Sequence, residues 1–251
     1  MKQNRRAYLR AWLAAHGRFE RDLRVKVARA RNRYIRDAAK AYEETGSVPQ
    51  YVTRRYTSEI ESLLIASGDK VALYFGAFAT RSVKKRHGVL ERKASTSFLA
   101  RIQNWVHTNA LANATAISGT DTDIIRARIN EGLAAGDGAA AIARNIRKAS
   151  GLSSVRAAMI ARTETHSAAN YGAIEETREV AGELGIVMEK EWIATNDDRT
   201  RQSHLDADGQ TVGIDEAFEV DNESLDMPGD TSASAENIIN CRCAVAYSEV
   251  L

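Results

Sequence analysis

The chain has 251 residues, of which 44% are hydrophobic and 27% charged, a composition typical of a soluble globular protein and too apolar for wholesale disorder. No uncharged apolar run approaches the ~18–20 residues that cross a bilayer, so we expect no membrane span, and two cysteines exclude a disulfide framework. The formal net charge is +2, but residues 1–150 hold 28 Lys and Arg against 13 Asp and Glu, whereas residues 151–251 hold 7 against 20.

The first predicted element is a long basic helix. Apolar residues recur with a helical period from Leu9 to Tyr42, which predicts a helix from about residue 4 to 44, ended by Gly46 and Pro49. At ~1.5 Å per residue this helix would be ~60 Å long. Because that is too long for one small core, we expect it to form an arm that reaches a partner.

Further helices are predicted up to the middle of the chain. One begins near Thr57, and the polar, basic stretch 82–93 predicts a turn. Another helix is predicted to begin at Gly119, and the linker 135–138 opens a short helix that Gly151 ends.

The C-terminal part combines one long helix with short strands. The helix is predicted from Ser153 to about Leu184, with Gly185 as its stop. Alternating and β-branched patterns predict strands at 186–194, near 210–212 and 218–220, and at 240–247. The region 195–237 is otherwise acidic and rich in loops.

These elements predict an α+β fold. We expect a mainly helical N-terminal region with a long basic helix, followed by a small, loop-rich C-terminal domain with helices on a sheet. The predicted division is residues 1–118, a basic arm and helical bundle, and residues 119–251, whose motif-rich part is 152–247.

The basic side chains of the first helix are candidates for binding DNA or an acidic partner, because such dense cationic clusters usually meet polyanions. The alternative is a solvated helix face. The candidates are Arg5, Arg6, Arg10, Arg18, Arg21, Arg24, Lys26, Arg29, Arg31, Arg33 and Arg36.

Polar residues of the acidic half form a second candidate group. Arg162 and Glu164 are two positions apart on a predicted helix, so they do not face each other and need partners in the loops that follow. We interpret the group as a structural polar network or a candidate site. Its members are Arg162, Glu164, Asp197, Arg199, Arg201, His204, Asp208, Asn240 and Arg242.

An enzyme would use the same residues differently. His204 would act as general acid or base, with Asp197 or Glu164 orienting it, and Arg199 or Arg201 would hold a phosphate, which describes a nucleic-acid hydrolase. The sequence has no nucleophile elbow, phosphate-binding glycine loop or HExxH motif. We therefore favour an ion-pair network that fixes a loop-rich fold and expect no enzymatic activity.

The two cysteines leave a choice between a metal site and a core. His204, Cys241 and Cys243, with Asp197 or Asp208 as a fourth ligand, are residue types that bind zinc. However, Cys-x-Cys is not the usual zinc spacing, and two residues in positions i and i+2 of a strand share one face. We expect buried, reduced thiols and no cofactor, with zinc as the alternative.

The motifs of the acidic half occur in a specific order. They are IARTET (160–165), Asn170, EW (191–192), DDRTRQSH (197–204), DGQTV (208–212), Phe218, PGD (228–230) and NCRC (240–243). In this order the sequence resembles the phage Mu F-like minor head proteins, the phage head morphogenesis family. The helical region before these motifs agrees with the family only in general character.

The resemblance implies a minor head protein of a tailed bacteriophage that acts beside the portal during procapsid assembly. It implies the portal protein and capsid or scaffolding proteins as partners. It also implies a location in the virion, in the head interior or at the portal vertex, after synthesis in the host cytoplasm. Some family members bind DNA and leave the capsid with the genome. The basic first helix fits double-stranded DNA bound without sequence preference. A DNA-binding regulator built on helices in residues 122–150 is a further hypothesis and would require base-specific contacts.

Overall fold

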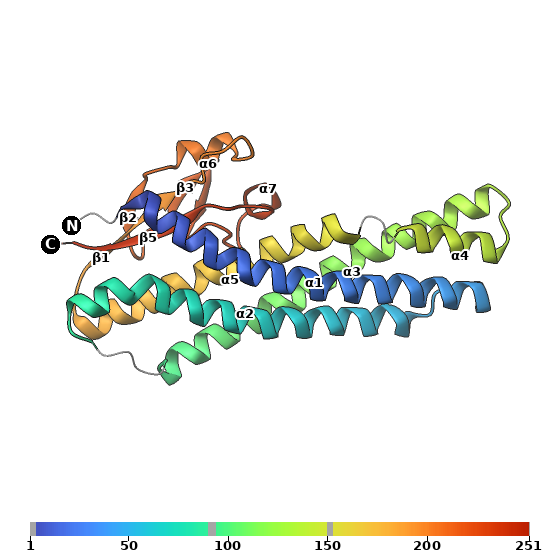
Figure 1. The fold of residues 1–251 in the computed structure, drawn as a ribbon, viewed down its shortest axis with the longest axis horizontal. Helices are drawn as coiled ribbons and strands as arrows, with labels where there is room; N and C mark the ends of the chain where they lie inside the picture. The colour runs from blue at the N-terminus through green and yellow to red at the C-terminus, as the bar shows by residue number, and fades with distance from the viewer. Residues whose placement is uncertain (1–3, 90–93, 150–152, 251) are drawn as a thin grey trace. The chain divides into compact units, whose positions relative to one another are not determined.

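The computed structural model describes residues 4–89, 94–149 and 153–250. The helices are α1 (Arg5–Thr45), α2 (Gln50–Arg86), α3 (Thr96–Ala134), α4 (Ala139–Lys148), α5 (Ser153–Leu184), α6 (Gln202–Asp206) and α7 (Ala235–Ile238) (Figure 1). The strands are β1 (Met188–Ile193), β2 (Thr211–Gly213), β3 (Phe218–Val220), β4 (Glu223–Leu225) and β5 (Ala244–Glu249). The predicted α+β class is confirmed, with a small antiparallel sheet in the C-terminal region.

Most predicted elements are confirmed, and two helix boundaries are wrong. α2 begins at Gln50 instead of near Thr57 and continues to Arg86 through the predicted turn. α3 continues through Gly119, where a new helix was predicted. A glycine inside a helix costs only about 1 kcal/mol, and the buried side chains of Ile117 and Ile125 on either side favour an unbroken helix. The rest of the predicted turn, at 90–93, and positions 151 and 152 lie outside the described residues.

The chain divides into two compact units, each made of several segments. Unit 1 consists of Met1–Glu20, Ser67–Val106 and Arg162–Leu251, and unit 2 of Arg21–Ala66 and His107–Ala161. α1, α2 and α3 each contribute to both units. The division at residue 119 follows sequence motifs and stays a prediction.

Unit 2 is a helical core with a polar centre. Leu23, Val27 and Ile60 are among its fully buried apolar side chains. Arg31 is also buried there, and its guanidinium donates two hydrogen bonds of 2.8 Å to the carboxylate of Asp121. The prediction that Arg31 belongs to the DNA-binding surface is therefore wrong, because its charge is neutralised inside the unit.

Unit 1 contains the sheet. Its strands run in the order β2-β1-β5, all antiparallel, and β3 pairs with β4 in a separate hairpin. Asp221 and Asn222 connect β3 to β4, and both have positive φ, as the tight hairpin turn requires.

In the same unit α5 packs closely on α2 because Gly172 has no side chain. A Cβ atom there would lie 2.1 Å from the carbonyl oxygen of Ala72.

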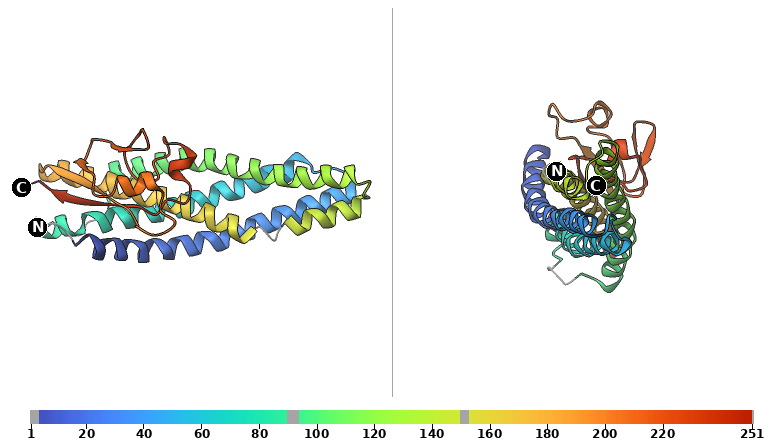
Figure 2. Two further views of the ribbon diagram at one scale, coloured as in Figure 1. Left: turned by 90° about the horizontal axis from the view of Figure 1, so that it is seen from above. Right: turned by 90° about the vertical axis from the view of Figure 1, so that its right-hand side faces the viewer.

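The start of α1 is part of unit 1 and does not extend away from it. The hydroxyl of Tyr8 donates a 2.8 Å hydrogen bond to the carbonyl oxygen of Val245 on β5, and Trp12 is buried in the same core. Figures 1 and 2 show these first turns, in blue, beside the red strand. One face of α1 thus packs into a core in each unit, so the helix does not project as an arm from a separate core. Its contact with a partner stays a prediction.

By length and composition alone, α2 is apolar enough to cross a membrane. Core helices pass the same test, and the buried side chains of α2 line the two cores. Ile60 and Leu64 belong to the core of unit 2, whereas Val71 and Phe75 belong to a core of unit 1. These contacts account for the apolar composition of the helix.

Candidate functional site

The loop after β1 is held against that strand by Asp208. One carboxylate oxygen of Asp208 accepts a 2.8 Å hydrogen bond from the backbone N–H of Ala194 and a 2.7 Å bond from the side chain of Arg5. Gly209 has φ of +85° and donates its N–H to the carbonyl oxygen of Trp192. The predicted turn at Asp208 and Gly209 thus fixes the path of the chain from α6 into β2.

Asp197 organises the turn that follows β1. Both of its oxygens accept from the guanidinium of Arg242, one of them at 2.6 Å, and Oδ1 also accepts from the backbone N–H of Arg199 at 3.0 Å. The hydrogen bond from Arg242 is the main reason that the pKa of Asp197 lies well below its usual value. Ionised Asp197 therefore connects this turn to the segment just before β5.

Arg162 links α5 to two other segments. Its guanidinium donates to the side-chain oxygen of Asn240 and to Glu20 on α1, each at 3.1 Å. Asn240 has positive φ, and its backbone N–H donates to the hydroxyl of Thr163. The predicted partner of Arg162 in a later loop is confirmed, while Glu20 was not foreseen.

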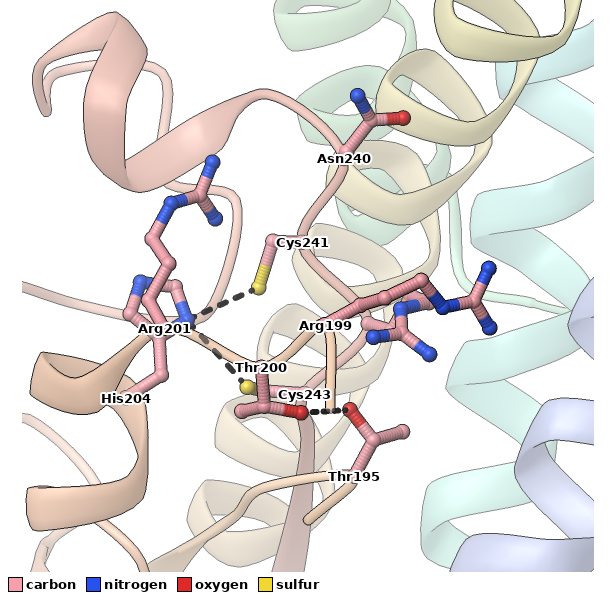
Figure 3. Close-up of a pocket in the computed structure, with 9 residues that line it drawn as sticks. Thr195, Arg199, Thr200, Arg201, His204, Asn240, Cys241 and Cys243 are labelled. Carbon is pink, nitrogen blue, oxygen red and sulfur yellow. Dashed lines mark hydrogen bonds between the residues drawn. The ribbon is translucent and has the colours of Figure 1, made fainter. Parts of the chain in front are cut away.

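His204, Cys241 and Cys243 meet in a buried cluster. The Nδ1 atom of His204 lies 3.5 Å from the sulfur of Cys241 and 3.4 Å from that of Cys243. Figure 3 shows both sulfurs facing the same edge of the imidazole ring. All three side chains are buried, and their nitrogen and sulfur atoms lie within 4.8 Å of one another, as metal binding requires.

The two thiols have different electrostatic environments. Burial raises the pKa of Cys241, but hydrogen bonding with Cys243 and the nearby imidazoles of His166 and His204 outweigh it, so the pKa lies well below the ordinary value. The pKa of Cys243 is raised, mainly by its hydrogen bond to Cys241 and by burial.

The contacts of His204 differ from those that the alternative hydrolase would use. The Nε2 atom of His204 bonds the side-chain oxygen of Asn237 at 3.2 Å, and Nδ1 faces the thiols. Asp197 is bound by Arg242. The contacts of the two ring nitrogens are thus an amide oxygen and two sulfurs.

The arginines of the candidate group line a small pocket. Arg199, Arg201 and Arg242 border this pocket, which lies beside the cluster of His204 and the cysteines (Figure 3). Arg201 donates to the carbonyl oxygen of Ile239. Asp208 and Glu164 are not among the residues that line the pocket.

Sequence reasoning missed two members of this site. His166 follows the IARTET motif directly and is fully buried beside Cys241, and Asn237 is buried against His204. The spacing of His166 from Arg162, four residues on one helix, puts both on the same face of α5 and was the available signal. Nothing in the sequence around Asn237 marks it.

Comparisons with known proteins agree with this arrangement of motifs. Residues 123–246 match the family described as Phage Mu protein F like protein. A relative from Bacillus phage SPP1, Minor head protein GP7, is 33% identical over 119 residues, which is 47% of this chain and 38% of that protein. NAD(+)--arginine ADP-ribosyltransferase EFV of Enterococcus faecalis is 38% identical over 115 residues, which is 45% of this chain and 23% of that protein.

The chain thus spans well under half the length of these two relatives. No solved structure is significantly similar to it. The matched segment contains every motif of the acidic half, together with the buried cluster and the Asp197–Arg242 clamp. Through residues 123–246, this chain belongs to the Phage Mu protein F like family.

Proposed function

We propose that the protein is a minor head protein of a tailed bacteriophage, acting at the portal vertex while the head assembles. The observation that carries this proposal is the family match over residues 123–246, supported by the relative named as a minor head protein. The structural role of the polar residues is consistent with it, since they clamp loops and do not form an acid–base pair. The proposed partners are the portal protein and capsid or scaffolding proteins, and the proposed location is the virion head after assembly in the host cytoplasm.

The loop-rich part of unit 1 is proposed as the protein-binding surface. Acidic side chains are exposed there, and DNA would repel them. A basic protein surface is a better match for this charge. These exposed acidic residues include Asp198, Asp215, Glu216, Glu219, Asp221 and Glu236.

The exposed side of α1 is proposed to contact double-stranded DNA without sequence preference. Arg6 and Arg10 share a helix face in unit 1, as do Arg29 and Arg36 in unit 2. Among the described residues, none of these four forms an ion pair, and the same holds for Arg21 and Arg24. Their charges are available to phosphates, whereas Arg5, Lys26 and Arg33 have carboxylate partners. Ejection of the protein with the genome is a further part of this proposal.

DNA binding is tested with a charge-removal variant. The variant changes Arg21, Arg24, Arg29 and Arg36 to Gln, and binding to two duplexes of unrelated sequence is measured by fluorescence anisotropy at several salt concentrations. If each side chain contacts a phosphate, the slope of log affinity against log salt falls by about 3–4. Both duplexes should show the same change, since base readout plays no part.

The matched control removes the same number of exposed charges elsewhere, at Arg81, Lys85, Arg144 and Lys148. It should keep the salt slope of the unmodified protein. Equal losses in the two variants would show attraction by overall charge and contradict a binding face on α1. Affinity that differs strongly between the two duplexes would instead support the regulator hypothesis.

The assembly role is tested by co-expressing the chain with the capsid and portal proteins of its own phage. A map of the purified procapsids should show it at the portal vertex in low copy number. If procapsids of normal composition exclude the protein, the assembly role fails, whatever the DNA measurements show.

A further inference from the structure

The cluster of His204, Cys241 and Cys243 has the dimensions of a tetrahedral zinc site. Zinc–sulfur bonds of about 2.3 Å and zinc–nitrogen bonds of about 2.0–2.1 Å put a nitrogen and a sulfur ligand about 3.6 Å apart at the tetrahedral angle. The distances from Nδ1 of His204 to the two sulfurs are 3.5 and 3.4 Å. An ion can therefore occupy the cluster with little movement of these side chains.

The imidazole of His204 is held in the form that binds a metal. Asn237 donates its amide N–H toward the carbonyl oxygen of Val220, at 3.5 Å, so its side-chain oxygen faces His204. That oxygen needs a donor, which places the proton of the neutral ring on Nε2. The lone pair is then on Nδ1, which faces the two sulfurs.

His166 on α5 is the candidate for a fourth ligand, and it lies outside the group of three whose ligand atoms are all within 4.8 Å of one another. Its side chain is fully buried, and its ring interacts with the thiol of Cys241. Among the described residues, its Nδ1 atom is buried without a hydrogen-bond partner, whereas Nε2 lies 3.3 Å from the side-chain nitrogen of Asn170. A buried ring nitrogen without a partner is costly, and a metal ion nearby would remove that cost.

We propose that Cys241, Cys243, His204 and His166 bind one structural zinc ion. Two thiolates and two imidazoles in a closed, buried arrangement are the ligand set that zinc prefers. The ion would connect α5, α6 and the segment before β5, all within unit 1. This region has short elements and long loops, so a metal cross-link would supply stability that its small sheet does not. Both cysteines can reach one ion despite their unusual Cys-x-Cys spacing, because alternate residues of an extended segment point the same way.

The first experiment measures the metal content of the full chain, purified without chelators and dialysed against metal-free buffer. We expect elemental mass spectrometry to find about one zinc ion per chain. Cys241→Ser, Cys243→Ser and His204→Asn should each lose most of it. The matched control, His107→Asn, changes an exposed histidine of α3 and should keep it.

A second experiment reports on the ligands even if a variant folds poorly. Cobalt(II) added to the chelator-stripped, unmodified protein should give the visible bands of a tetrahedral site and the charge-transfer absorption of cobalt–thiolate bonds. His166→Asn should keep the charge-transfer absorption and lower the affinity for the metal. Asn237→Ala, which removes only the partner that orients His204, should lower the affinity about 10–100-fold.

The proposal fails if the purified chain contains no stoichiometric zinc and cobalt gives no charge-transfer absorption. It also fails if the two cysteines form a disulfide in the protein isolated under reducing conditions. If His166→Asn binds zinc as tightly as the unmodified chain, the assignment of the fourth ligand is wrong. These outcomes are independent of whether the protein is found at the portal vertex.

Discussion

Arg31 on α1 and Asp121 on α3 form a bidentate ion pair in the interior of unit 2. Both side chains are almost fully buried, with 2% and 4% of their surface exposed, and each of the two hydrogen bonds is 2.8 Å long. Asp121 also accepts from Tyr56 and from Arg156. One carboxylate thus joins four helices, because Tyr56 is on α2 and Arg156 is on α5.

Removing Arg31 from this pair should destabilise the protein strongly. Arg31→Met leaves a buried carboxylate that has lost its main partner, and we expect the free energy of unfolding to fall by about 3–5 kcal/mol in urea titrations. Arg29→Met, on the exposed side of the same helix, should change it by less than about 0.5 kcal/mol. Equal effects of the two substitutions would mean that the pair does not hold the unit together.

The same carboxylate should make stability depend on pH. Burial by itself raises the pKa of Asp121, but the hydrogen bonds from Arg31 and Tyr56 outweigh it, so the pKa lies below its usual value. A carboxyl with a depressed pKa in the folded state adds stability above the unfolded pKa of about 3.9, and this stability is lost as pH falls through the folded pKa.

This linkage is checked by urea unfolding of the unmodified protein and Asp121→Asn between pH 2 and 7. The difference in unfolding free energy should be constant above about pH 5 and should shrink below about pH 4. A difference that stays the same at all pH values would show that the ionised form of Asp121 is not favoured by folding.

Alanine substitutions at two glycines of α5 should change the stability of the protein in opposite directions. At Gly172 a Cβ atom would lie 2.1 Å from a backbone oxygen of α2, so Gly172→Ala must push two helices apart and should cost about 1–3 kcal/mol or more. Gly182 has no neighbour within 4 Å of a Cβ position, and Gly182→Ala should stabilise the helix by up to about 1 kcal/mol. Thermal unfolding compares them, and a stabilising Gly172→Ala would contradict the close helix contact.

Lys190 and Asp226 form a pair in unit 1 whose two members should differ in mutational cost. The Lys190 ammonium is fully buried on β1 and donates to the carboxylate of Asp226 at 2.6 Å. Asp226→Ala leaves that charge without its counter-ion and should cost about 3–5 kcal/mol, whereas Lys190→Met replaces it by an apolar side chain and should cost far less. The carboxylate keeps Arg178 as a partner in the second variant. Equal costs in chemical denaturation would show that the buried charge is not the dominant penalty.

The long helices could be predicted because their apolar residues repeat regularly. The stripe on α1 gave its limits to within about one residue, and Gly185 correctly marked the end of α5. The hairpin of β3 and β4 was only half predicted, since β4 is three residues long and carries no strong pattern. Gly119 was misleading because a local preference of about 1 kcal/mol is smaller than the burial of the isoleucines beside it.

The sequence predicted which residues form the candidate site, but it did not predict which of them contact each other. Arg162, Asp197, Arg242 and His204 were all identified from their motifs. However, no spacing in the sequence indicates that Arg242 binds Asp197 or that Asn237 orients His204, because each pair joins segments more than thirty residues apart. His166 was overlooked because it lies among small residues of a helix that otherwise reads as core.

The sequence by itself determined the class of fold, the family and the uneven distribution of charge, since these depend on local periodicity, ordered motifs and composition. Only the tertiary structure decided which charges are available. It buried Arg31 against Asp121, paired Arg242 with Asp197, left Arg21 and Arg24 exposed, and brought His166 near Cys241. The physical reason is that desolvation and pairing depend on neighbours in space, which a pattern along the chain does not contain.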